Sequence, residues 1–156
     1  MHITIVAVGQ KLPAWAQTAV DDYLARFPRD FTVTVKEVKA EARTGGKPVA
    51  QVMAAEAERI ERAFPAGDIL VAMDEHGRDM TTVDFSKKIS GWKNEGCGVT
   101  FIIGGADGLD PALKAKSRMM LRLSSMTLPH AFARVLLTEQ IYRAWSILAN
   151  HPYHRV

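Results

Sequence analysis

The stretch that decides the fold, residues 98–131, reads GVTFIIGGADGLDPALKAKSRMMLRLSSMTLPHA. Its run 99–103 is short, apolar and rich in β-formers, which is typical of a strand buried on both faces. That run ends at Gly104 and Gly105, where the backbone can take conformations closed to other residues. A second strand is predicted over residues 119–123, and it ends in the loop 124–129. Because these two strands are expected to be neighbours in a parallel sheet, their loops predict a ligand site at its carboxyl edge.

The rest of the chain alternates between strand and helix patterns, which favours an α/β fold with a parallel sheet. Strands are predicted over residues 2–8, 31–38 and 68–74. Helices are predicted over residues 13–26, 48–64, 81–92 and 130–150, with a short helix starting at Asp110-Pro111. Thr81 and Asp84 resemble a capping box, and Asp110 resembles an N-cap followed by a first-turn proline.

Two helices have apolar patterns that predict which faces are buried. In the helix over 13–26, the apolar residues Trp15, Ala19, Tyr23 and Phe27 lie near helical spacing. In the helix over 48–64, Glu56 falls on the charged face opposite the apolar one.

The polar segment 39–47 follows the second strand and contains Gly45 and Gly46. It can be a solvated loop, or a mobile arm that places Lys39, Arg43 and Lys47 against phosphates. Composition favours the loop.

The whole composition fits one cytosolic domain spanning residues 1–156. The chain has 156 residues, 47% of them hydrophobic, and a net charge of +3. No apolar run approaches the roughly 20 residues of a membrane span, and the N-terminus does not resemble a signal peptide. Cys97 is the single cysteine, so an internal disulfide is excluded, and no spacing typical of metal ligands occurs. The mild positive charge permits a nucleic-acid partner without requiring one.

The last helix is apolar around almost its whole circumference, which requires cover on more than one side. We expect the sheet to cover one side and a second copy of the chain another, which predicts a homodimer. Burial within one subunit is the alternative. The helix has a narrow polar strip of Glu139, Arg143 and Ser146, in which Glu139 and Arg143 are spaced for an ion pair.

Several motifs together make this chain resemble a known family. They are Ile103-Gly104-Gly105, Leu123-Ser124, Thr127-Leu128-Pro129-His130, Tyr142-Arg143-Ala144-Trp145-Ser146 and the terminal NHPYHR. On these residues the chain is similar to the SPOUT methyltransferases, and more narrowly to the ribosomal RNA large subunit methyltransferase H family of pseudouridine N3-methyltransferases. One departure is Ala106-Asp107, where the family more often has Pro-Glu.

The resemblance implies a deep trefoil knot over about residues 70–156, with S-adenosylmethionine bound inside it and no metal. The residues that it implies for the cofactor are Met73, Gly104, Gly105, Leu123, Ser124, Ser125, Met126, Thr127 and Leu128. The glycines would let the backbone approach the ligand, although a tight turn without a ligand would also need them. The hydroxyls of this loop can equally serve ordinary turn chemistry.

The resemblance further implies methyl transfer to N3 of a pseudouridine in 23S ribosomal RNA, in the hairpin facing the subunit interface. This nitrogen carries a proton, so the enzyme must offer a base or stabilise the developing anion. The candidate residues are His130, Arg143 and the tail residues His151, Tyr153, His154 and Arg155. The tail can be frayed, as chain ends commonly are, or can reach the methyl-donor pocket within one chain or across a dimer. His130 can equally be a structural residue at a helix start.

Two other functions fit the sequence. One is a non-catalytic module that binds RNA or the ribosome, with the loops as plain turns. The other is a related SPOUT enzyme that methylates another RNA, such as transfer RNA.

Overall fold

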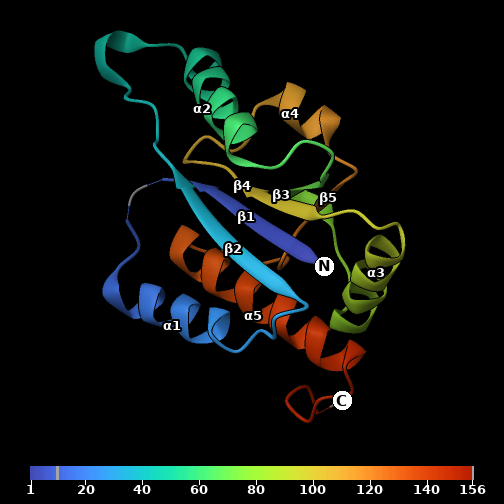
Figure 1. Ribbon diagram of the computed structural model, residues 1–156. Coiled ribbons are helices and arrows are strands. Elements are labelled where there is room, and N and C mark those ends of the chain that lie inside the picture. The colour runs from blue at the N-terminus through green and yellow to red at the C-terminus, as the bar shows by residue number, and fades with distance from the viewer. Residues whose placement is uncertain (10, 156) are drawn as a thin grey trace.

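Five parallel strands form one twisted sheet with helices on both faces (Figure 1). The computed structural model describes residues 1–9 and 11–155. The strands are β1 His2–Val8, β2 Thr32–Val38, β3 Ile69–Arg78, β4 Val99–Ile103 and β5 Met119–Leu121, in the order β2-β1-β4-β3-β5. Every recorded pairing between strands is parallel, which confirms the predicted α/β class. The expectation that β4 and β5 are neighbours is wrong, because β3 lies between them.

The helices are α1 Ala14–Leu24, α2 Val49–Ala63, α3 Thr82–Asn94, α4 Pro111–Lys116 and α5 His130–Leu148, with a 3₁₀ turn at Thr44–Gly46. α1, α3 and α5 cover one face of the sheet, and α2 and α4 cover the other (Figure 1). Two predicted caps are present. The Thr81 hydroxyl accepts a hydrogen bond from the Asp84 N–H at 3.1 Å, and the Asp110 carboxylate accepts one from the Ala112 N–H at 2.8 Å.

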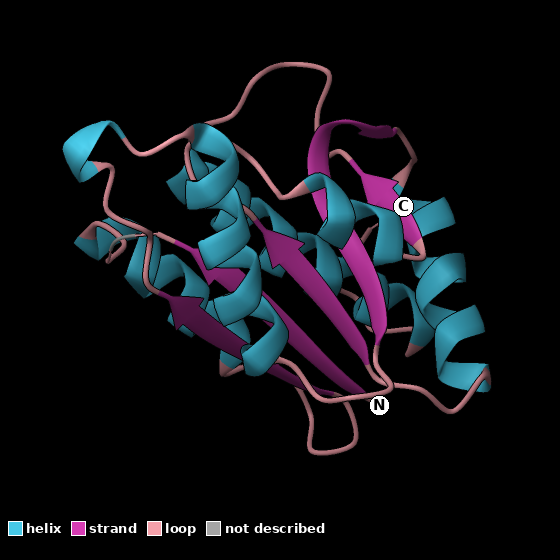
Figure 2. Cartoon of the chain, turned by 90° about the horizontal axis from the view of Figure 1, so that it is seen from above, coloured by secondary structure: helices cyan, strands magenta, loops and turns pink. Residues whose placement is uncertain are grey.

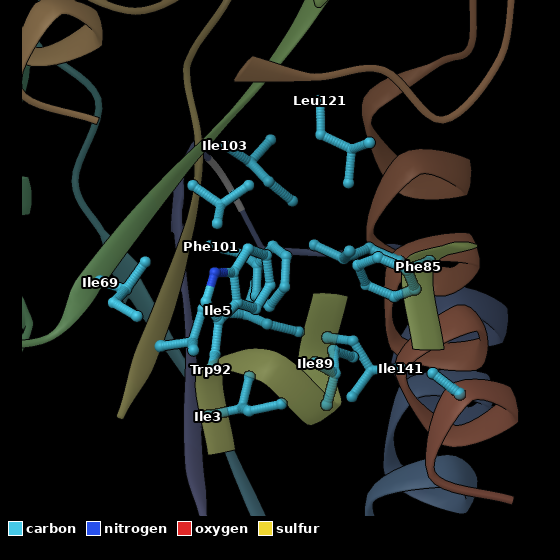
Figure 3. Close-up of a cluster of buried hydrophobic side chains, with 14 of the residues drawn as sticks. Ile3, Ile5, Ile69, Phe85, Ile89, Trp92, Phe101, Ile103, Leu121 and Ile141 are labelled. Carbon is cyan, nitrogen blue, oxygen red and sulfur yellow. The ribbon is translucent and has the colours of Figure 1, made fainter. Parts of the chain in front are cut away.

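The central strands bury side chains on both faces, as their apolar composition predicts. Alternate residues of β1 enter different cores: Ile5 faces α3 and α5, whereas Val6 faces α2 and α4. In the larger core, Phe101 of β4 meets Phe85 of α3 edge-on, with the ring centroids 5.9 Å apart (Figure 3). This double cover makes the sheet a rigid support for the loops at its edge.

β3 is longer than the predicted strand 68–74. Its register against β5 shifts between Met73 and Arg78, and the strand curls over the sheet edge (Figure 2). Gly77 permits this path, because a Cβ there would lie 2.7 Å from backbone atoms of Leu121. Residues 75–78, outside the predicted strand, are therefore an irregular continuation of it.

α5 lies against the sheet between α1 and α3 (Figure 1). Neighbours within one subunit therefore explain much of its apolar circumference. The polar strip does not face solvent as a whole, because Glu139 and Ser146 are buried. The predicted ion pair is present, with Arg143 Nη2 2.7 Å from Glu139 Oε1.

The burial of two other residues differs from expectation. Trp15 is 51% exposed, and α1 instead buries Ala16 and Val20. Glu56 of α2, expected on the charged face, lies instead on the buried face between Val52 and Ile60. It is only 5% exposed and accepts a hydrogen bond from the Glu41 N–H at 3.0 Å.

The segment 39–47 is held against the body of the protein by several contacts. The Glu41 carboxylate pairs with Arg59 at 3.0 Å, and Arg59 also donates to the Lys39 carbonyl at 2.9 Å. Arg43 pairs with Asp107 in the loop after β4. The prediction of a solvated loop is confirmed, because residue 39 and residues 42–46 are exposed although the segment is docked. A role for Lys39, Arg43 and Lys47 in binding phosphates stays a prediction.

No helix in the described part of the chain is long and apolar enough to cross a membrane. The trefoil knot over about residues 70–156 stays a prediction from the resemblance.

Candidate active site

The irregular part of β3 and the loops that follow β4 and β5 meet at the carboxyl edge of the sheet and enclose a cleft. Two adjoining hollows form it, and both are lined by Met73, Asp74, Glu75, Ile103, Leu128 and Ala133. We call the two together the edge cleft. One hollow of about 160 Å³ extends over residues 121–128. The other, about 610 Å³, extends over the loop 104–108 to Lys114 and His130, and it has the size typical of small-molecule sites.

Gly104 and Gly105 both line the cleft. The space that a side chain would need at these positions is occupied by other residues of the protein. A Cβ on Gly104 would lie 2.6 Å from the Gly108 carbonyl carbon. A Cβ on Gly105 would lie 3.1 Å from Glu56 Oε1. The glycines therefore let the loop 104–108 fold tightly against itself and over α2, and this fold presents its backbone to the cleft.

The loop after β5 combines apolar side chains with unpaired backbone groups. Leu123, Ser124, Met126, Thr127 and Leu128 all line the cleft, whereas the exposed Ser125 lies outside its lining. The Ser124 hydroxyl accepts from the Met126 N–H at 2.9 Å, as ordinary turn chemistry predicts. For the N–H groups of the other residues over 123–128, no partner is recorded in the described part of the chain. These groups can therefore pair with the polar edge of a ligand.

Acidic residues of the cleft were missed by the sequence analysis. Asp74 lies where β3 becomes irregular, and its carboxylate accepts from Lys114 Nζ at 3.0 Å. Burial raises the pKa of Asp74, but the His76 N–H and Lys114 outweigh burial, so that the pKa lies below its ordinary value. Asp74 is therefore an anion at neutral pH. Its only sequence signal is its place just after an apolar strand.

His130, at the start of α5, lines the cleft and is fixed by a buried arginine. Arg134 is 2% exposed; its Nε donates to His130 Nε2 at 2.8 Å, and its Nη1 lies 3.2 Å from Glu37 Oε2. Burial lowers the pKa of His130, and the Arg134 charge lowers it further, while Glu37 raises it. Because a guanidinium can only donate, His130 Nε2 must be unprotonated and its proton must be on Nδ1.

The tail residues form a second cluster around the C-terminal half of α5. The Ser146 hydroxyl lies 2.8 Å from His154 Nδ1, and Arg143 donates to the His154 carbonyl at 3.2 Å. The Tyr153 hydroxyl donates to Glu139 Oε1 at 3.1 Å. Burial, followed by a hydrogen bond with Tyr23, raises the pKa of Tyr153. The tail is thus folded onto α1 and α5, and Arg155 at its end is exposed.

The proposed catalytic residues therefore fall into two groups within one chain. His130 begins α5 at the edge cleft, whereas Arg143, Tyr153, His154 and Arg155 lie toward its far end, near the opposite edge of the sheet (Figure 1). Arg143 lies thirteen positions after His130, which corresponds to about 20 Å along a helix. The tail does not reach the edge cleft of its own subunit.

Comparison with known proteins assigns the chain to a class. Residues 1–154 match the family described as "Predicted SPOUT methyltransferase". The chain belongs to the SPOUT methyltransferase family, as its motifs predicted. Within the described residues there is no group of three or more His, Cys, Asp or Glu side chains that could hold a metal ion.

Relatives that match this chain over almost its whole length have a name more specific than that of the family. A relative from Ralstonia pickettii strain 12J is 53% identical over 156 residues, covering 100% of both chains. One from Bordetella avium strain 197N is 55% identical over 155 residues, covering 99% of both. Each is named "Ribosomal RNA large subunit methyltransferase H", the family whose motifs this chain resembles.

Solved structures share the fold at low sequence identity. The SpoU methyltransferase AviRb from Streptomyces viridochromogenes aligns with a TM-score of 0.50 at 15% identity, covering 96% of this chain and 61% of its own. TrmJ from Z. mobilis ZM4 aligns with a TM-score of 0.50 at 18% identity, covering 90% and 69%.

Proposed function

We propose that this chain binds S-adenosylmethionine in the edge cleft and transfers its methyl group to N3 of a pseudouridine in 23S ribosomal RNA. The substrate would be the hairpin that faces the subunit interface, and the reaction would take place in the cytosol. The observation that carries the proposal is the edge cleft itself, in a chain of the SPOUT family. Relatives more than half identical over the full length, named for large-subunit ribosomal RNA, support the choice of RNA.

The walls of the edge cleft fit an adenosyl group. Met73, Leu123 and Leu128 offer apolar contacts, and the unpaired N–H groups of the loop over 123–128 can bind the polar edge of adenine. Asp74 and Glu75 add acceptors for hydroxyl or ammonium groups. The bound cofactor supplies an activated methyl group, so much of the rate enhancement would come from positioning.

His130 would act on the RNA base as a hydrogen-bond donor. While Arg134 donates to its Nε2, the ring has no free nitrogen to accept a proton. Its Nδ1–H can stabilise the negative charge that develops on a carbonyl oxygen beside N3 when the N3 proton leaves. This contact argues against His130 as the general base.

Arg143 and the tail would come from a second copy of the chain. Within one chain they lie at the far end of α5 from the edge cleft. The outward side of α1 and α5 exposes Trp15, Phe132, Leu136 and Leu148, and the Trp15 and Phe132 rings lie 4.9 Å apart. We propose that this apolar surface pairs in a homodimer and that each tail completes the partner's cleft.

Methylation of purified ribosomes and of transfer RNA, followed by mass mapping, tests this function. The proposal predicts one added methyl group on N3 of one 23S pseudouridine and none on transfer RNA. Methylated transfer RNA would identify instead a SPOUT enzyme with another substrate. Binding without methylation of either RNA would identify a non-catalytic module.

Deletion of residues 151–156 tests the role of the tail. We expect methylation to be abolished, while the affinity for S-adenosylmethionine stays within about twofold, because the cofactor walls lie elsewhere. Calorimetry and the methylation assay on the same preparation measure both quantities. Full activity of the truncated protein would exclude the tail from the site.

A further inference from the structure

A further hollow, separate from the two that form the edge cleft, lies between α3 and the sheet edge formed by β5. Its lining includes Arg78 at the end of β3, Lys87 and Lys88 of α3, and Arg118 just before β5. Its single acidic lining residue is Glu95, and it encloses about 430 Å³. We call it the basic hollow.

The lining of this hollow carries an excess of positive charge. Four cationic side chains and one carboxylate give its lining a net charge of +3, which equals the net charge of the whole chain. Arg118 has Glu95 as a partner at 3.3 Å, but Arg78, Lys87 and Lys88 make no ion pair among the described residues. All three are exposed. Cations that repel one another and lack a partner are typical of a surface that binds an anion.

The shape of the hollow leaves room for that anion. Gly91 lies on α3 one turn after Lys87 and Lys88, and a Cβ on Gly91 would meet nothing within 4 Å. The helix surface therefore has open space one turn after the two lysines, while Trp92 is buried next to Gly91. An oxyanion can enter without displacing a side chain.

A basic path joins the hollow to the edge cleft. Arg122 lines the cleft, and its backbone N–H donates to the Arg78 carbonyl at 3.1 Å. Arg78 ends β3 and pairs with Leu121 of β5, and Arg122 directly follows that strand, with its Nη2 3.7 Å from Asp79 Oδ2. A polyanion that enters the cleft at one end would pass both arginines on its way to Lys87 and Lys88.

We propose that the basic hollow binds backbone phosphates of the ribosomal RNA strand whose base enters the edge cleft. This inference rests on the proposed function, because it takes ribosomal RNA as the partner. Lysine ammonium groups are flexible point charges suited to phosphate, and phosphate contacts fix the register of a strand without reading its sequence. The hollow would therefore position the RNA, while the cleft selects the base.

The double substitution Lys87→Ala/Lys88→Ala tests the proposal through the salt dependence of binding to purified ribosomal RNA. Loss of two phosphate contacts should reduce the slope of log K against log salt by about 1.4, and weaken binding about 25-fold at 0.1 M salt. Lys93→Ala is the matched control, because Lys93 is an exposed lysine of the same helix outside the hollow. The affinity for S-adenosylmethionine should be equal in all three proteins.

Gly91→Glu and Gly91→Gln form a second, isosteric pair that leaves every lysine in place. Both side chains fit the open space, but only glutamate adds a negative charge, so Gly91→Glu should weaken RNA binding more than Gly91→Gln.

Equal salt slopes for the wild type and the double lysine variant would overturn the proposal. If the wild type methylates ribosomal RNA and the slopes are equal, the hollow is excluded and the proposed function stands. If the double variant has a smaller salt slope than the wild type but the wild type methylates no RNA, the proposed function fails, whereas phosphate binding in the basic hollow is supported.

Discussion

His130 and Arg134 share a hydrogen bond that determines the charge state of the histidine. Arg134→Met removes both the donor and the positive charge, so we expect the pKa of His130 to rise toward its ordinary value of about 6.5. Glu37→Gln should do the opposite, because Glu37 raises this pKa. NMR titration of the ring in each variant measures the pKa. A His130 pKa that stays unchanged in Arg134→Met would contradict the assigned contact.

The lowered pKa of His130 also has a consequence for stability. The unfolded chain, with an ordinary histidine pKa of about 6.5, binds the proton more readily than the folded protein. The contribution of His130 to stability is therefore complete above about pH 6.5 and is lost as the pH falls through and below that value. Denaturation of the wild type and of Arg134→Met at pH 7.5 and 5.5 should show a smaller pH effect in the variant.

At the scale of the residue, the sequence predicted the cleft better than it predicted the buried charges. The apolar strand and Gly104-Gly105 located a loop that lines the edge cleft, because strand ends and glycines are local signals. Glu56 and Arg134 gave no such signal. They are charged residues on the buried face of their helices, Glu56 between Val52 and Ile60 and Arg134 three residues before Leu137. The docked segment 39–47 and the carboxylate of Glu37 supply their partners.

At the scale of the element, two glycines predict opposite effects of the same substitution. Gly77→Ala places a methyl group 2.7 Å from the backbone of Leu121, so we expect a loss of about 2 kcal/mol or more in the free energy of unfolding. Gly91→Ala, inside α3 and in open space, should add about 0.5–1 kcal/mol through helix propensity. Chemical denaturation measures both values. Equal effects of the two substitutions would refute the close approach of β3 to β5.

The strands and helices themselves were predictable, whereas their spatial order was not. Apolar runs and caps located all five strands and the five α-helices within a few residues. The insertion of β3 between β4 and β5, and its irregular extension to Arg78, depend on contacts between distant segments. The apolar circumference of α5 predicted cover on several sides, and α1, α3 and the sheet supply much of it within one subunit.

At the scale of the whole molecule, the separation of the tail from the edge cleft predicts a site made by two subunits. A chain carrying Leu128→Trp, which fills the cleft, and a chain lacking residues 151–156 should each be inactive alone. In an equal mixture half the dimers are mixed, and each has one complete site, so about one quarter of the wild-type activity should return. Methyl transfer to ribosomes measures this recovery. A mixture as inactive as its components would show that the tail acts within its own chain.

The central claim is that the edge cleft holds the methyl donor, and calorimetric titration with S-adenosylmethionine tests it most directly. Leu128→Trp should fill the cleft and abolish the heat of binding, whereas Val49→Trp adds the same ring at an exposed position of α2 outside the cleft. We predict one binding site per chain in the wild type and in Val49→Trp, and none in Leu128→Trp. Undiminished binding by Leu128→Trp, or no binding by the wild type, would contradict the account.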